Sequence, residues 1–551
     1  MSFLVFVGPG ADQQFAALKV REFESGQVVQ EHQKLSREEF VRLAATLERD
    51  LAPRWVMSRS TPWLTPLVEA NVHLAKTYML DLSQRILHRS PFSAHPVPDV
   101  DLDYHIPRVT HPGQDALFAE PTAAGETLPE LEGRYLSQRR ALPTDPQRRQ
   151  RLELLLHAES IGSLIALEME HHGLAWDERG HRALLREQLG ARVAEGLRPP
   201  RLAELAEQLA QQLNAPGLNP DSPQELLRAL QRVGYSLSSV RAWELEEHRD
   251  PLIEQVLQYK SLSRLASSHG DAWLDQWIRD SRFHPHYVLG TVASGRWAAS
   301  GGGALQLPRA IRQVITAPPG KVFVVADGSQ LEPRILGAIS QDTALQRAGA
   351  GKDLYQGLID SKVAANREEA KLGMLSAIYG GGTAKASGVV SALERNFPRA
   401  MEYVASAARA GERGDGVESW LGRGCPPADA DWMQLQRNTV DATAQRAADL
   451  AARARGRFTR NFVVQATAAE WALIWMAQTR HLIFSAGLHT RCKQVFFVHD
   501  EVVFETDTEL AQGLAQALKL AAQRAGQTLF GANAPDFPVS INTVANYADA
   551  K

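Results

Sequence analysis

The sequence predicts a protein of the α+β class with several subdomains. A chain of 551 residues that is 44% hydrophobic can bury three or four separate cores. Apolar and charged residues alternate at helical periods over Arg148–Gly173 and Glu178–Leu213. Apolar runs typical of strands follow near Val288–Thr291, Val322–Ala326 and Val495–Val498, with helical stretches between them. Helical stretches and separate strands in one chain favour the α+β class.

Four segments are expected along the chain. The first begins with the apolar run Met1–Val7, which is typical of a strand, and is expected to form a small domain. A stretch rich in Pro, Gly, Thr and Glu, from Pro107 to Gly133, indicates a linker. A Gly-, Pro- and Asp-rich span near Arg413–Asp431 is expected to be a loop. The predicted boundaries are 1–110, 111–150, 151–285 and 286–551.

Two of the apolar runs end in carboxylates, Asp327 in the first and Asp500 in the second. A hard cation such as Mg²⁺ is usually held by one or two carboxylates together with substrate phosphates. Two such ions would stabilise both the attacking and the leaving oxygen of a phosphoryl displacement. Asp327 and Asp500 are therefore predicted to bind two Mg²⁺ ions, for which Mn²⁺ could substitute. The alternative is that both acids are ordinary turn residues.

Between the acidic runs lies a helical pattern that ends at Gly380. Four of its residues recur at every fourth position: Arg367, Lys371, Leu375 and Tyr379. They share one helix face. Two cations followed by an apolar and an aromatic side chain suit a nucleotide, with the cations on the triphosphate. Gly380 would end the helix with a flexible joint. A solvated surface is the alternative for such a face.

A second helical pattern places Arg457, Asn461 and Gln465 four residues apart. Donors and amides on one face, with apolar residues on the other, suit a helix that packs on a core while it touches a nucleic-acid duplex. An ordinary amphipathic helix is the alternative.

Together these motifs resemble those of family A DNA polymerases, the DNA polymerase I type. The family's first acidic motif, D-Y-S-Q-I-E-L-R, is similar to Asp327–Arg334, and its R-x-x-x-K-x-x-x-F/Y-x-x-x-Y-G helix to Arg367–Gly380. The second acidic motif, V-H-D-E, stands at Val498–Glu501. The resemblance runs from about Leu152 to the C-terminus. It implies a right-hand polymerase with an antiparallel palm sheet, a helical thumb within 151–285, and fingers at about 345–455.

The resemblance also implies roles for the residues of the two acidic motifs and the helix. Asp327 and Asp500 would hold the metals, and Glu501 would neighbour the primer end. Arg367 and Lys371 would hold the phosphates, and Lys371 would also protonate the pyrophosphate leaving group. Chemistry of this kind is mostly positioning and charge stabilisation.

Further contacts with the incoming dNTP and with the primer–template DNA follow from the same resemblance. Glu332 resembles the family's steric gate, which rejects ribonucleotides at the sugar C2′. Gln330, Tyr355, Leu375 and Tyr379 would lie at the dNTP as well. The residues expected to touch DNA are Arg296, Arg457, Asn461, Gln465 and His499.

The sequence departs from the family pattern at four of these positions. Leu375 stands where the family has Phe or Tyr, and a leucine cannot stack on the sugar and base. Tyr355 stands where the family more often has His, and Gly328 replaces Tyr. Pro333 falls inside the first acidic motif, which suits an edge or the end of a strand. These changes put nucleotide affinity and sugar selectivity in doubt, but they leave the metal carboxylates in place.

Family members often carry a 3′–5′ exonuclease domain ahead of the polymerase. Its metals would need an Asp-x-Glu on the first strand, and Met1–Val7 is followed by none. Asp81 could be a relic of a later exonuclease motif, whereas Asp99, Asp101 and Asp103 suit a linker. Residues 1–110 are therefore expected to form a degenerate exonuclease-like domain without proofreading.

Composition adds broader expectations. The formal net charge of −3 is unusual for a nucleic-acid protein, although binding depends on local cations. Two cysteines, Cys425 and Cys492, indicate a reducing compartment. With no secretory signal or membrane-length apolar run apparent, we expect a cytoplasmic, nucleoid-associated monomer without a membrane partner.

Three alternatives stay open at this point. Single-subunit RNA polymerases share the palm and begin their first acidic motif with Asp-Gly-Ser, so ribonucleotide polymerisation or relaxed sugar selectivity is possible, although Glu332 argues against it. A second alternative is a non-catalytic DNA-binding protein that keeps the polymerase shape. The third, a nuclease, is disfavoured by the missing Asp-x-Glu.

Overall fold

The computed structural model contains both helices and sheets, which confirms the α+β class. It describes residues 2–10, 15–58, 62–100, 126–194, 196–381, 384–532 and 534–550. The chain folds into two compact units that are described separately. Unit 1 comprises Met1–His172, Tyr287–Ser300 and Val322–Thr543, and unit 2 comprises Gly173–His286, Gly301–Lys321 and Val544–Lys551.

The N-terminal part of unit 1 is a five-stranded sheet of order β3-β2-β1-β4-β5. Its strands are β1 (Phe3–Pro9), β2 (Ala16–Glu22), β3 (Val28–Leu35), β4 (Arg54–Met57) and β5 (Lys76–Met79), and its helices are α1 (Arg37–Leu51), α2 (Leu64–Glu69) and α3 (Leu80–Arg89). β1 runs antiparallel to β2 and parallel to β4. A central strand is covered on both faces, which explains why β1 is a continuous apolar run, as its sequence predicted.

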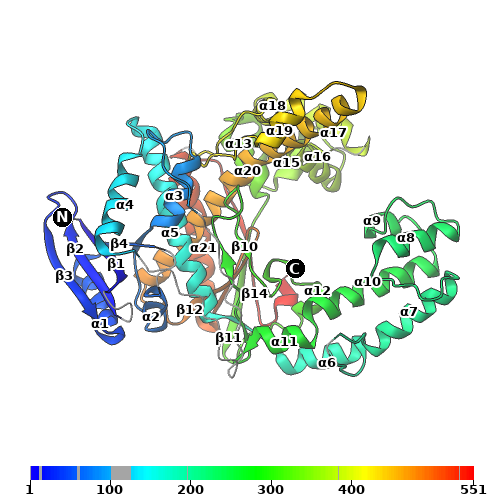
Figure 1. Ribbon diagram of the computed structural model, residues 1–551, viewed down its shortest axis with the longest axis horizontal. Coiled ribbons are helices and arrows are strands. Elements are labelled where there is room, and N and C mark those ends of the chain that lie inside the picture. Colours follow the sequence, from blue (N-terminus) through cyan, green and yellow to red (C-terminus); the bar gives the residue numbers. More distant parts are fainter. Residues whose placement is uncertain are drawn as a thin grey trace. The chain divides into compact units, whose positions relative to one another are not determined.

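The segment expected to be a linker is largely helical where the structure describes it. Residues 101–125, with Asp101 and Asp103, lie outside the described residues. Beyond them come α4 (Leu128–Arg140), shown beside the five-stranded sheet in Figure 1, and α5 (Pro146–His172). The linker prediction was wrong here because Thr127 and Glu130 form a capping box that starts α4. The predicted boundary at 150/151 also falls inside α5.

A four-stranded sheet of order β12-β13-β11-β14 forms the second part of unit 1. Its strands are β11 (Lys321–Gly328), β12 (Cys492–Val498), β13 (Glu501–Asp507) and β14 (Val539–Val544), and a separate hairpin joins β9 (Tyr287–Val288) to β10 (Ala298–Ala299). The strands predicted near Val288, Val322 and Val495 are therefore present. β12 and β13 are antiparallel, with a shift of register between Gln494 and Phe496 that makes Val495 an extra residue.

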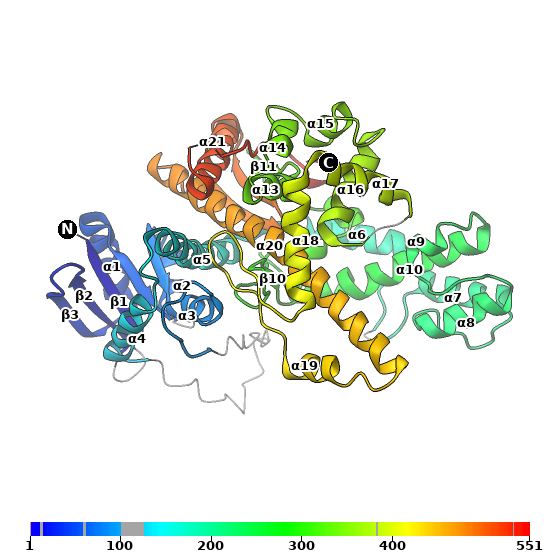
Figure 2. The ribbon, with the colours of Figure 1, turned by 90° about the horizontal axis from the view of Figure 1, so that it is seen from above.

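The longest helix of unit 1, α20 (Ala442–Ser485), organises the packing around this sheet. It contacts α5, α18 (Pro398–Glu412), α19 (Ala430–Arg437) and α21 (Ala511–Phe530) (Figure 2). Trp471 and Trp475 of α20 are fully buried. The remaining described α-helices are α13 (Leu331–Ile339), α14 (Thr343–Gly349), α15 (Leu354–Asp360), α16 (Arg367–Tyr379) and α17 (Ala384–Asn396), with a 3₁₀ turn η2 (Thr508–Leu510).

Unit 2 is mainly helical, and it includes the helices expected over Glu178–Leu213. They are α6 (Glu178–Leu189) and α7 (Pro200–Gln212), followed by α8 (Pro223–Arg232), α9 (Ala242–Leu245), α10 (Pro251–His269), α11 (Asp271–Trp277) and α12 (Arg309–Arg312). Three short strands, β6 (Leu174–Ala175), β7 (Ile278–Arg279) and β8 (Arg282–Phe283), and two 3₁₀ turns, η1 (Ala304–Gln306) and η3 (Tyr547–Ala550), complete it. Trp176, Trp273 and Phe283 form its aromatic core, with ring centroids 5.2–5.8 Å apart.

Among the described residues, no helix is long and apolar enough to cross a membrane.

Candidate active site

The four-stranded sheet brings the two predicted metal acids together. Asp327 lies near the end of β11, and Asp500 lies in the turn between β12 and β13. The Gly328 amide donates to the Asp500 carbonyl oxygen at 3.1 Å, which joins the two acidic segments. Burial, and then the nearby charge of Asp327, raise the pKa of Asp500 to about 7. A divalent cation between the two carboxylates would relieve this cost, so the residues fit a metal of the Mg²⁺ type.

The turn that carries Asp500 contains two residues and is geometrically demanding. His499 adopts the left-handed conformation, with φ 60°, and its side chain is exposed. Val498 pairs with Glu501 across the hairpin, and Glu501 is only 2% exposed at the start of β13. The three consecutive side chains therefore differ in exposure: His499 is exposed, Asp500 is half-buried and Glu501 is buried.

The raised pKa of Asp500 predicts a pH-dependent gain in stability when the acid is removed. Unfolded aspartate ionises near pH 3.8, whereas the folded carboxyl ionises near 7. The free energy of unfolding therefore falls as the pH rises between these values, and the whole loss is present above pH 7. In EDTA, Asp500→Asn should raise the free energy of unfolding by about 4 kcal/mol at pH 8, and by less at pH 5. Urea unfolding at both pH values measures the difference, and an equal gain at both would contradict the assignment.

Three further predicted residues meet at Glu332, which lies in the first turn of α13. Its carboxylate accepts hydrogen bonds from the Tyr379 hydroxyl at 2.5 Å and from the Arg296 guanidinium. Gln465 of α20 hydrogen-bonds to the same Tyr379 hydroxyl. Burial and the Glu332 carboxylate raise the pKa of Tyr379 to about 12, so the phenol stays protonated. The predicted gate thus sits in a network of groups from four segments.

A second cluster forms at the start of α16, around an acid that the sequence analysis missed. Asp353 pairs with Arg367 at 3.0 Å, and the Gln330 amide donates to it at 3.3 Å. The Arg367 guanidinium also lies over the Tyr355 ring, 5.3 Å from its centroid. Burial raises the pKa of Tyr355 to about 12, leaving a neutral phenol. Asp353 caps the N-terminus of α15, and an Asp directly before a helical run is the signal that could have indicated it.

The rest of the predicted nucleotide face also lies on α16. Lys371 is exposed and Leu375 is half-buried. Gly380 ends the helix with φ 67°, and a Cβ there would lie 3.2 Å from side-chain carbons of Arg457 and Arg460. Only glycine combines this conformation with so close an approach. The joint expected at Gly380 is therefore a tight contact between α16 and α20.

The predicted DNA-contact face of α20 shows a gradient of exposure. Arg457 is exposed, while Asn461 and Gln465 are half-buried. The Asn461 side-chain oxygen is buried and has no hydrogen-bond partner among the described residues. Arg460, which the sequence analysis did not single out, donates to the Ala377 carbonyl at 2.7 Å and holds α16 on α20.

Arg334 is a third missed residue, and it fixes the backbone beside the site. Its side chain is buried, and its guanidinium donates to the carbonyls of Gly349, Lys352 and Asp536 and to the Gln330 side chain. Pro333, expected at the end of a strand, instead lies in the first turn of α13, where a missing N–H leaves no acceptor unsatisfied.

The loop expected near Arg413–Asp431 is irregular, and two of its side chains take part in a buried cluster of charged residues in unit 1. Arg423 pairs with Glu159 of α5 at 2.7 Å, with side chains 7% and 1% exposed. Nearby, the Glu470 carboxylate accepts from the Ser419 hydroxyl and the Leu421 amide. Burial raises the pKa of Glu470 to about 7, although Arg423 opposes the shift. We call Glu159, Ser419, Arg423 and Glu470 the buried charge cluster.

The buried charge cluster also supports the hairpin that presents Arg296. Gly295 has φ 78°, and a Cβ there would lie 2.5 Å from the central guanidinium carbon of Arg423. Arg423 therefore packs directly against the residue that precedes Arg296.

An open cleft of about 900 Å³ lies beside the Asp353 cluster. Gln330, Lys352 and Asp353 line one side, and Lys519 and Gln523 of α21 are also in its wall. Its walls carry both polar and apolar side chains, and Asp353 in the wall pairs with Arg367.

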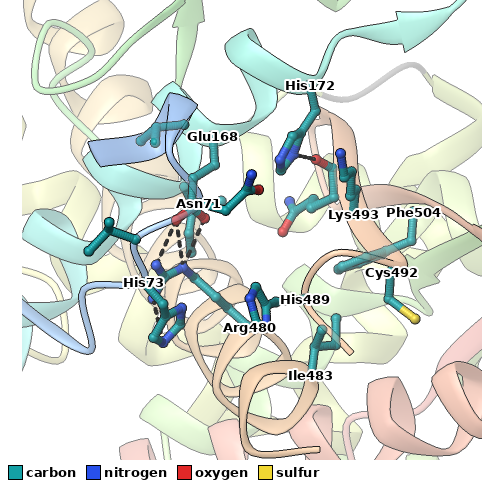
Figure 3. Close-up of a pocket in the computed structure, with 14 residues that line it drawn as sticks. Asn71, His73, Glu168, His172, Arg480, Ile483, His489, Cys492, Lys493 and Phe504 are labelled. Carbon is teal, nitrogen blue, oxygen red and sulfur yellow. Dashed lines mark hydrogen bonds and ion pairs between the residues drawn. The ribbon is translucent and has the colours of Figure 1, made fainter. Parts of the chain in front are cut away.

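A second pocket, of about 70 Å³, shares no lining residue with that cleft. In Figure 3, Arg480 of α20 reaches Glu168 of α5, with contacts down to 2.6 Å. Arg480 also donates to the Leu74 carbonyl at 2.9 Å. His73 stacks on Phe484, with centroids 3.4 Å apart, and burial lowers the pKa of His73 to about 2. A paired arginine and a neutral imidazole make this pocket a packing joint between the N-terminal part of unit 1 and α20.

Asp81, the possible exonuclease relic, and Asp99, assigned to a linker, each lie in an ion pair. Asp81 pairs with Arg134 and accepts from the Ser58 hydroxyl at 2.5 Å. Asp99 lies 3.2 Å from Arg85. Within the described residues, no group of three or more His, Cys, Asp or Glu side chains could hold a metal. Two acids that also need substrate phosphates, as proposed for Asp327 and Asp500, do not require such a group.

The family model and the similar proteins described next all belong to the DNA polymerases. The family model described as DNA polymerase family A matches residues 199–545. The chain is 28% identical over 398 residues to DNA polymerase I of Chloroflexus aurantiacus, covering 64% of this chain and 39% of that protein. It is 24% identical over 316 residues to the thermostable DNA polymerase I of Thermus aquaticus, covering 52% and 36%. The chain thus spans about two fifths or less of these relatives.

A solved structure gives the likeness in fold. The POL domain of Pol1 from M. smegmatis, in complex with DNA primer-template and dNTP, matches with a TM-score of 0.66 at 20% identity. The match covers 100% of this chain and 96% of that one.

Proposed function

Because the chain belongs to DNA polymerase family A, we propose that it extends the 3′ end of a primer on a DNA template with dNTPs. The observation that carries this proposal is the pairing of Asp327 with Asp500 beside the Glu332 network. The structure in complex with DNA primer-template and dNTP supports the choice of partners by analogy. In this proposal the four-stranded sheet is the palm, helices at about 345–455 are the fingers, and helices within 151–285 are the thumb and the base of the palm.

Each side chain of the site then has a task in phosphoryl transfer. Asp327 and Asp500 would hold two Mg²⁺ ions, which would supply stabilisation of the charge on the attacking and leaving oxygens. The primer 3′ hydroxyl loses its proton to solvent, its oxygen bonds to the α-phosphorus, and the bond from that phosphorus to pyrophosphate breaks. Arg367 moves from Asp353 onto the triphosphate, and Lys371 gives a proton to the departing pyrophosphate. Glu501 borders the primer end.

Around this centre, Glu332 and Tyr379 confine the sugar. Gln330 and Tyr355 support the phosphate side through Asp353 and Arg367. Arg296, Arg457, Asn461, Gln465 and His499 contact the primer–template.

Sugar choice depends on Glu332 together with the departure at Leu375. A half-buried leucine cannot stack on the nucleotide as Phe or Tyr does, which weakens dNTP binding by about 1 kcal/mol, or several-fold in affinity. We expect Leu375→Phe to lower the KM for dNTPs several-fold. We expect Glu332→Ala to raise ribonucleotide insertion, because it removes the group held against the sugar. Steady-state insertion of a single dNTP or rNTP measures both effects.

Leu375→Met serves as the matched control, since it changes shape without adding a ring. If Leu375→Phe leaves both specificity constants unchanged, Leu375 is a packing residue only. A wild-type protein that prefers rNTPs would favour the RNA-polymerase alternative.

We further propose that extension occurs without proofreading. Asp81 is engaged by Arg134, and β1 carries no acid in its sequence Phe3–Pro9. Acting on chromosomal DNA as a monomer, the protein would work in the cytoplasm at the nucleoid.

A primer-extension assay tests the proposal as a whole. Purified protein receives a matched or 3′-mismatched primer–template, dNTPs, and Mg²⁺, Mn²⁺ or EDTA. We expect extension with either metal and none in EDTA, with no shortening of the mismatched primer. Failure to extend with both metals would refute the proposed activity, and metal-dependent shortening would refute the absence of proofreading.

A further inference from the structure

The N-terminal half of α20 concentrates positive charge in a chain of net charge −3. Between Ala442 and Arg460, five arginines stand against one acid, Asp449. Asp449 accepts from the Gln445 side chain within the same helix. Local cations of this kind, rather than the net charge, govern binding to phosphates.

Two of the five arginines are held by the protein itself. Arg455 donates to the Pro426 carbonyl at 3.0 Å, and its guanidinium lies 6.0 Å from the Trp432 ring centroid. Arg460 donates to the Ala377 carbonyl, as described above. These two guanidinium groups therefore contribute to packing.

The other three arginines, Arg446, Arg453 and Arg457, are exposed and share one face. Arg453 also donates to the Asp449 carbonyl at 3.2 Å, within its own helix. At about 100° per residue the three arginines fall within a sector of about 40°, and at about 1.5 Å per residue they span about 16 Å of helix. Leu450, between the first two, is 62% exposed. We call Arg446, Arg453 and Arg457 the α20 arginine stripe.

The α20 arginine stripe is continuous with the candidate active site. Beyond Arg457, the next residues along this side of the helix are Asn461 and Gln465. The first has an unpartnered buried oxygen among the described residues, and the second reaches Tyr379. A strand of DNA that leaves the site along α20 would meet amides first and then guanidinium groups.

We propose that Arg446 and Arg453 bind backbone phosphates of the primer–template and so extend its contact surface about 16 Å outward from Arg457. This inference rests on the proposed function. A DNA strand carries one phosphate per 3.4 Å of duplex axis, so the stripe is long enough to meet several phosphates. Guanidinium groups pair well with phosphate oxygens. Leu450 supplies an apolar contact for a sugar or base between the two arginines.

The test compares Arg446→Gln/Arg453→Gln in the full chain with a control that removes equal charge. Arg409→Gln/Arg413→Gln is the control, because both arginines are exposed at α18 and each pairs with an acid. Fluorescence anisotropy gives the affinity for a primer–template between 50 and 300 mM salt. Each lost phosphate contact lowers the slope of log affinity against log salt by about 0.7–0.9.

We expect the stripe variant to bind about tenfold more weakly at physiological salt and its slope to fall by about 1.4–1.8 in magnitude. Arg446→Lys/Arg453→Lys should keep most of the slope, and the Arg409→Gln/Arg413→Gln control should extend primers at the wild-type rate. An unchanged slope in the stripe variant, or an equal fall in the control, overturns this inference while leaving the polymerase proposal intact. A wild-type protein that binds DNA without extending it leaves this inference standing and refutes the polymerase proposal.

Discussion

Asp327→Asn and Asp500→Asn should each slow primer extension by about a thousandfold or more, which corresponds to about 4 kcal/mol of lost transition-state stabilisation. Each change removes one charge from the pair that would hold the metals, and an amide binds Mg²⁺ far less well than a carboxylate. Single-turnover extension by one nucleotide at saturating DNA and dNTP measures the loss.

The control is Asp507→Asn, at the far end of the same hairpin, where Asp507 pairs with Arg491 at 2.5 Å. This variant should extend primers at the wild-type rate. Both active-site variants should still bind primer–template, and Asp500→Asn should gain stability in EDTA. Wild-type extension by either active-site variant would show that the reaction does not depend on this pair of acids.

The second large effect concerns the buried charge cluster. Arg423→Met should lower the free energy of unfolding by about 3–5 kcal/mol, since it leaves Glu159 in the interior without its cationic partner. The loss should be greater at pH 8 than at pH 5. Without Arg423 the pKa of Glu470 rises above about 7, so keeping Glu470 ionised costs more folding free energy at high pH. Urea unfolding followed by circular dichroism at the two pH values measures both effects.

Arg409→Met is the matched control, because Arg409 forms an exposed ion pair with Glu402. This variant should lower the free energy of unfolding by less than about 1 kcal/mol. Glu159→Gln/Arg423→Met removes both charges and should recover part of the loss. If Arg423→Met costs no more than the surface control, the cluster is not an essential part of the core. Weaker DNA binding by folded Arg423→Met at low temperature would indicate that the support for Gly295 also matters to Arg296.

The positions of Asp327 and Asp500 at strand ends could be predicted because their signal is local. Asp327 and Asp500 each follow an apolar run, and a run that ends in a turn places its acid at the edge of a sheet. The shared face of α16 was predictable for a similar reason, because residues four positions apart lie on the same side of any α-helix. The class of fold follows from the same local patterns.

Residues whose role depends on distant backbone could not be found in this way. Arg334 binds carbonyls of Gly349 and Asp536, and Arg423 reaches Glu159 across 264 positions of sequence. Neither arginine belongs to a periodic pattern. The linker prediction failed for a different reason, since Thr127 and Pro129 suit both a flexible stretch and the first turn of a helix. The proposed roles of the individual site residues remain predictions until the variants are measured.

The extra residue at Val495 has a consequence for how this chain can change in length over evolution. It separates β12 into two parts, Cys492–Gln494 and Phe496–Val498. The second part pairs with Glu501–Val503 without interruption up to the turn. A residue gained or lost before Gln494 can be absorbed at the irregularity, whereas a slip after Phe496 turns every following side chain to the opposite face. Insertions and deletions among related chains should therefore occur before the position of Val495 and not between Phe496 and the turn. The turn that carries Asp500 is therefore protected from changes in chain length that occur only a few residues upstream.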